Sequence, residues 1–140
     1  MQLTVGEIYD AVQALIRIEQ SKRMIPQIAK FRLARMHDRL EPLYKAIETR
    51  HAALHQELGS EQFNEQKESL GWGIREGTDA HVAYLERWQV VRAEPVEVKI
   101  SPITLESLGD DPKGLEVLDF KMLGKLVYST HDVPEPVGNA

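Results

Sequence analysis

The stretch that decides the fold runs from Pro26 to Gly59 and reads PQIAKFRLARMHDRLEPLYKAIETRHAALHQELG. Its apolar side chains recur every seven residues along two neighbouring seams. The first seam is Leu33, Leu40, Ile47 and Leu54, and the second is Ala29, Met36 and Leu43. This spacing predicts one long helix with a wide apolar face.

Two residues should shape this helix. Pro42 lies inside it, and its ring clashes with the carbonyl of Asp38, so we expect a kink or a break there. Gly59 stands where a left-handed helix C-cap belongs.

The apolar face must be covered, either by helices of the same domain or by a partner. It is wider than a small bundle needs, which favours a homo-oligomer. We expect the oligomer interface on the stripe formed by Leu33, Met36, Leu40, Tyr44 and Ile47.

A second helix precedes this one. Thr4 and Glu7 form the pattern of a capping box, and Ile8, Val12 and Leu15 follow at helical spacing, which predicts a helix over residues 5–20. Pro26 then restarts the chain as a helix. Residues 4–58 are therefore predicted to form a helical hairpin.

Residues 60–78 are harder to interpret. Residues 60–70 are polar, with only Phe63 and Leu70 to bury, and residues 71–77 hold three glycines and read as a loop around Trp72. A tryptophan between glycines either anchors a partner or covers the core as a lid. We take Trp72, Ile74 and Arg75 as the candidate partner-binding residues.

The rest of the sequence predicts a small α+β portion over residues 78–128. A short helix capped by Thr78 or Asp79 should bury one face, formed by Val82, Leu85 and Trp88. Residues 96–100, VEVKI, alternate as a strand, whose partner could be residues 71–77, residues 126–128 or another copy of the chain.

The last helix should begin at Asp111-Pro112, with the tail at 129–140 flexible. Its predicted apolar stripe is Leu115, Leu118, Met122 and Leu126. The fold class is thus mainly α (α+β), in one domain over residues 1–128, with one or two strands in its small C-terminal portion.

Composition excludes several classes of function. The 140 residues contain no cysteine, which excludes disulfides, thiolate nucleophiles and cysteine-based zinc sites. No segment is apolar enough to cross a membrane, and the N-terminus lacks the pattern of a signal peptide, so we expect a cytoplasmic protein. The net charge of −5 makes nucleic acid an unfavoured partner.

One basic stripe stands out against that charge. Arg32, Arg35 and Arg39 share a helical face that could follow a phosphate backbone. Acidic neighbours dilute it, and we favour a solvated face with helical ion pairs.

The sequence offers one weak pattern for chemistry. His51 and His55 lie four residues apart, with Glu48 one turn earlier, a spacing at which two imidazoles can converge on a metal. A zinc site needs at least three protein ligands, and only Glu48 is at hand, so we expect no metal and no other cofactor. No pattern of nucleophile and base is present, and the chain is not expected to be an enzyme.

The order of the segments is distinctive as a whole. LTVGEI at residues 3–8, the long charged helix ending in Leu-Gly, VEVKISPI at 96–103 and LEVLDF at 115–120 resemble a family of small bacteriophage and prophage proteins of unknown function. The resemblance covers residues 3–127. It implies a phage-encoded protein that is not secreted, and it carries no catalytic residues over.

Two hypotheses follow. In the first, a phage accessory protein in the host cytoplasm binds a host protein, such as a defence component, and inhibits it. In the second, a virion head or tail protein assembles into a homo-oligomer through its long helix.

Overall fold

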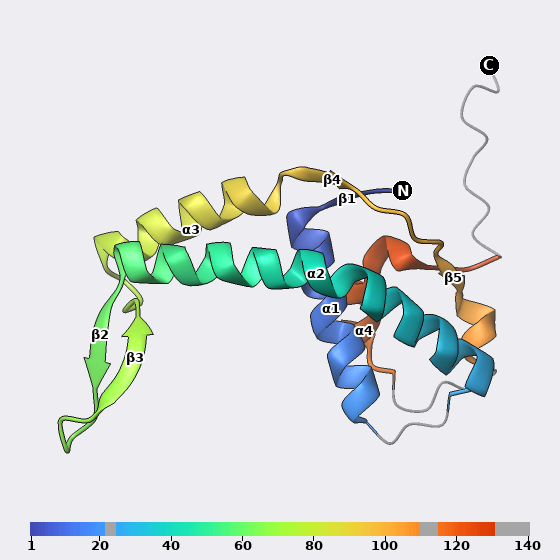
Figure 1. The fold of residues 1–140 in the computed structure, drawn as a ribbon, viewed down its shortest axis with the longest axis horizontal. Coiled ribbons are helices and arrows are strands. Elements are labelled where there is room, and N and C mark those ends of the chain that lie inside the picture. The colour runs from blue at the N-terminus through green and yellow to red at the C-terminus, as the bar shows by residue number, and fades with distance from the viewer. Residues whose placement is uncertain (22–24, 110–114, 131–140) are drawn as a thin grey trace.

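The computed structural model describes residues 1–21, 25–109 and 115–130. Figure 1 shows a body of crossing helices from which one long helix extends as an arm, with a β-hairpin at its far end. The protein is mainly α with a few short strands, as the sequence predicts. The proposed start of the last helix at Asp111-Pro112 and residues 131–140 of the tail lie outside the described residues.

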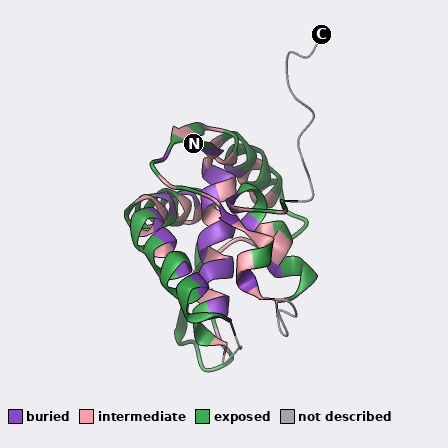
Figure 2. Ribbon diagram, turned by 90° about the vertical axis from the view of Figure 1, so that its right-hand side faces the viewer, coloured by how far each residue is buried: buried purple, intermediate pink, exposed green. Residues whose placement is uncertain are grey.

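Helix α1, Val5–Gln20, is the centre of the body. The predicted capping box is present: the Thr4 amide donates to Glu7 Oε1 at 2.9 Å, and the Glu7 amide donates to Thr4 Oγ1 at 3.1 Å. Ile8, Val12 and Leu15 are buried, as expected. Because α2 and α4 both pack against α1, buried residues run along it (Figure 2).

Helix α2, Gln27–Leu58, is continuous through Pro42. A proline removes one backbone donor and crowds the preceding turn, which bends a helix without having to end it. Figure 1 shows the two halves of α2 pointing in different directions, so the expected change of course occurs as a bend and not as a break. The first half crosses the body and the second half forms the arm.

The stripe proposed as an oligomer interface is covered by the chain itself. Leu33, Met36, Leu40 and Ile47 are at most 5% exposed, and Tyr44 is half-buried. They belong to the same core as the apolar side of α1. The expectation that these residues lie between copies is wrong, because α1 and the segments packed beside it already cover them.

Helix α3, Asp79–Arg92, runs back along the second half of α2 (Figure 1). Thr78 is its N-cap, and its hydroxyl accepts from the His81 amide at 3.2 Å. The predicted buried face is wrong except at Trp88, because Val82 and Leu85 are 53% and 43% exposed. The side facing α2 carries Tyr84 and Trp88 instead.

The strands form three two-stranded sheets in the described ranges. β1, Gln2–Thr4, pairs antiparallel with β4, Pro95–Glu97, and β5, Ile103–Thr104, pairs parallel with β6, Val127–Tyr128. The predicted strand at 96–100 is therefore shorter and begins at Pro95. Its partner is the N-terminal strand, which none of the three expected partners included.

The C-terminal part closes the body with short elements: η1, Leu105–Leu108, α4, Val117–Leu123, and η2, Gly124–Leu126. Leu123 and Leu126 are buried, but Leu118 is 50% exposed, so the stripe predicted for this helix is wrong at that position. The buried side of α4 carries Asp119 and Leu123, one turn apart, so Leu118 lies on the outer side. No helix of the described residues has the length and apolarity needed to span a bilayer.

Candidate functional site

The end of the arm is a hairpin made of β2, Ser60–Phe63, and β3, Ser69–Gly73. The strands are antiparallel, and Glu61 faces Trp72 across the ladder. The turn between them is held by Asn64, whose side-chain oxygen accepts from the Glu68 amide at 2.8 Å. The expected loop at 71–77 is thus partly a strand, because residues 60–63 pair with it.

Close packing at Gly59 sets the angle at which the hairpin leaves α2. Gly59 is extended, with φ −90°, so the predicted left-handed cap is wrong. A Cβ at this position would overlap the carbonyl oxygen of His55 and lie 2.7 Å from that of Gly73. Glycine is required here because helix and hairpin backbones meet, not because of its φ.

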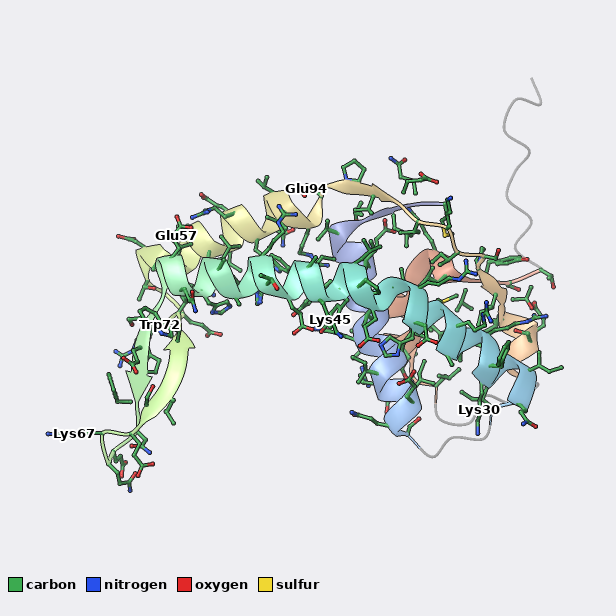
Figure 3. All side chains as sticks on the ribbon, viewed as in Figure 1. Lys30, Lys45, Glu57, Lys67, Trp72 and Glu94 are labelled. Atoms are coloured by element: carbon green, nitrogen blue, oxygen red, sulfur yellow. The ribbon has the colours of Figure 1, made fainter. Side chains whose placement is uncertain are left out.

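The hairpin exposes three large apolar side chains, which we call the hairpin patch: Phe63, Leu70 and Trp72. They are 57%, 67% and 53% exposed, respectively. Trp72 is therefore not a lid on the core. Figure 3 shows Trp72 on the hairpin, away from the body, with Lys67 at the turn.

The other two predicted partner-binding residues follow β3. Ile74 is half-buried and Arg75 is exposed. The Arg75 carbonyl accepts from the Thr78 hydroxyl at 2.7 Å, which fixes the turn into α3. The structure places Trp72, Ile74 and Arg75 in one short segment and adds Phe63 and Leu70, which the sequence showed only as isolated apolar residues in a polar stretch.

The base of the arm is a cluster of aromatic rings from α1, α2 and α3. His51 Nε2 and the Tyr84 hydroxyl form a hydrogen bond, and the His51 ring lies 4.4 Å from that of Trp88, centroid to centroid. Tyr9 of α1 meets Trp88 edge-on at 5.4 Å. These rings hold the arm to the body.

Burial lowers the pKa of His51 below its ordinary value, and the neighbouring His55 lowers it further. The two rings are 4.6 Å apart and meet edge to face. No group of three His, Asp or Glu side chains able to hold a metal occurs in the described part of the chain. In this arrangement the His51 ring hydrogen-bonds to Tyr84, and the His55 ring packs against the rings of His51 and Tyr84.

Two ion pairs support the arm and the body. Arg92 makes a bidentate pair with Asp10, at 3.2 and 2.7 Å, which ties α3 to α1. Asp119 is 1% exposed, accepts from the Glu116 amide at 3.0 Å, and has Arg17 at 3.5 Å. Sequence reasoning missed Asp119, although Glu116 and Asp119 have the spacing of a capping box.

The basic stripe lies on the first half of α2, at the opposite end from the hairpin. Arg32, Arg35 and Arg39 line a groove between α2 and residues 100–103. The expected ion pairs with helical neighbours are missing for Arg32 and Arg35, as far as the described residues show. Arg35 instead lies 5.7 Å over the Phe31 ring.

These features offer two surfaces: an apolar hairpin on an arm and a basic groove on the body. Neither surface brings together a nucleophile, a base and a group that orients the base within the described ranges. Comparisons with models of protein families, with characterised proteins and with solved structures find no match for this chain.

Proposed function

We propose that this protein acts by binding another protein through the hairpin patch at the end of its arm. The observation that carries the proposal is the exposure of Phe63, Leu70 and Trp72, each more than half accessible, on a hairpin outside the core. Burying apolar surface contributes about 25 cal/mol per Å², so three such side chains offer a strong anchor.

The position of the hairpin and the edges of its strands favour contact with a partner. It extends from the end of α2, far from the body (Figure 1). Neither β2 nor β3 pairs with a further strand among the described residues, so each strand keeps an outer edge with backbone groups that a partner can bind.

The charges around the patch indicate what the partner offers. Residues 60–77 carry four glutamates against one lysine and one arginine. An apolar cleft with a basic rim matches this surface, since opposite charges steer association, while a partner with an acidic rim would be repelled. Arg75 then marks the edge of the contact, next to Glu76.

The resemblance to small phage proteins makes a host protein the proposed target, with inhibition or redirection of that target as the outcome. The function is recognition without bond chemistry. The protein would act in the host cytoplasm. A role in virion assembly has lost its main support, because the stripe thought to join copies lies in the core of one chain.

The test is capture of partners from a bacterial lysate on the full-length protein, followed by measurement of Kd with the purified partner. Phe63→Ala and Trp72→Ala are the test variants. Phe31→Ala is a matched control, because Phe31 is 61% exposed but lies on the body. Loss of a hot-spot aromatic costs about 2 kcal/mol or more, which weakens binding roughly 30-fold.

The control variant should bind as the unchanged protein does. If Trp72→Ala binds the partner as tightly as the unchanged protein, or if Phe31→Ala loses as much affinity as Trp72→Ala, the hairpin patch is not the contact. Sizing of the free protein provides a second check, because a stable ring of many copies would revive the assembly role.

A further inference from the structure

A groove with walls from two segments of the chain lies beside the first half of α2. Its volume is about 330 Å³, and its walls are three arginines of α2 on one side and residues 100–103 on the other. Arg39 donates to the Lys99 carbonyl at 2.7 Å, so its guanidinium is held at the edge of the groove. Met36, Ile100 and Ile103 supply apolar wall beside these charges.

The positive charge in this groove comes from the three arginines of α2. Over residues 25–39 the chain has four Lys and Arg and a single acid, a net charge of +3, so the remainder carries −8 against −5 for the whole chain. The single acid, Asp38, lines the adjoining stretch of groove with Pro42 and Glu97. In the part of the chain that the structure describes, Arg32 and Arg35 have no carboxylate partner.

We propose that this groove binds a small phosphate-bearing molecule of the nucleoside phosphate class. Guanidinium groups match phosphate oxygens in a bidentate fork, and three of them suit a ligand with several negative charges. A ligand with a single carboxylate would need only one guanidinium. The apolar wall suits a flat base, and the volume is that of a small-ligand site.

A nucleoside phosphate fits this groove better than a nucleic acid. A long polyanion would leave the groove and meet the acidic remainder of the chain, which repels it. A compact di- or triphosphate keeps its charge within reach of Arg32, Arg35 and Arg39.

The groove is independent of the proposed protein contact. Arg35 and Leu58 are 23 residues apart on one helix, which corresponds to about 35 Å. Ligand binding in the groove can therefore be tested without touching the hairpin patch, and failure of one proposal leaves the other standing.

The experiment is calorimetric titration of the full-length protein at low salt with ATP, GTP and inorganic pyrophosphate as probes. We expect binding of at least one nucleotide, weakened at least ten-fold in the double variant Arg32→Gln/Arg35→Gln. Arg75→Gln, an exposed arginine on the hairpin segment, is the matched control and should bind as the unchanged protein does.

A third variant tests the shape of the groove. Ser101 is exposed and lines it, so Ser101→Trp fills the space and leaves the net charge unchanged. Nucleotide binding should fall at least ten-fold. Circular dichroism spectra of all variants should match that of the unchanged protein, because none of the substituted residues is in the core.

Three results would overturn the proposal. The first is no binding of any probe at millimolar concentration. The second is nucleotide binding that the double variant retains. The third is tighter binding of a 20-nucleotide single strand than of any nucleotide, lost in the double variant, which would make the groove a nucleic-acid site.

Discussion

Trp88 should be the aromatic residue on which the stability of the arm depends. It is 7% exposed and contacts Tyr9 and His51, whereas Trp72 is 53% exposed on the hairpin. Removing a buried aromatic side chain costs about 3–5 kcal/mol, through lost burial and the cavity left behind. An exposed side chain costs less than about 1 kcal/mol.

Urea unfolding followed by circular dichroism measures the two costs directly. We expect Trp88→Ala to lower the free energy of unfolding by about 3–5 kcal/mol, equivalent to roughly 10–17 °C in Tm for a chain of this size. Trp72→Ala should change it by less than about 1 kcal/mol.

Fluorescence gives an independent readout, because the chain has two tryptophans and each variant keeps one. Trp88 alone, in Trp72→Ala, should emit as a buried ring and shift to the red on unfolding. Trp72 alone, in Trp88→Ala, should emit as an exposed ring in the folded state. Equal costs for the two variants, or a larger cost for Trp72→Ala, would refute the assignment of the core and of the hairpin patch.

The other predictions concern the core, the ring cluster and the hairpin junction. Leu40→Asp should cost several kcal/mol, because it places an unpaired charge at a fully buried position; an unchanged Tm would contradict this. Burial and His55 depress the folded-state pKa of His51, so the unfolded state binds more protons and stability should fall as pH drops below about 6.5. Between pH 7.5 and 5.5 the urea midpoint of His51→Gln should decrease less than that of the unchanged protein. An equal decrease in both proteins would refute His51 as the source of the pH dependence. Gly59→Ala should shift the hairpin, because its Cβ meets the backbone at His55 and Gly73; hydrogen exchange should show faster exchange in β2 and β3, and unchanged rates would contradict the close approach.

Local patterns in the sequence predicted the helical part of the fold. The Thr4–Glu7 capping box and the spacing of Ile8, Val12 and Leu15 place α1 at its observed bounds. The seven-residue repeat predicts α2, and Gly59 marks its end. These features depend on contacts within one or two turns, which a short window of sequence contains.

Sequence reasoning identified only part of the candidate site. Trp72 stood out because glycines flank it, but the sequence left open whether it covers the core or is exposed, and the structure shows it exposed. The β-hairpin escaped notice because residues 60–63 lack the alternation of a strand and become one through pairing with residues 69–73. The groove could not be predicted from a local pattern, because it forms between two segments more than 60 residues apart, Arg32 to Arg39 and residues 100–103.

By itself, then, the sequence determined that the segments of α1 and α2 are helical and which face of each is apolar, since both follow from neighbours along the chain. The tertiary structure alone decided what covers those faces. It placed Leu40 in the core of its own chain, paired β4 with the N-terminus and left the hairpin patch exposed. The reason is that covering a face depends on contacts between distant segments, whose geometry no local spacing encodes.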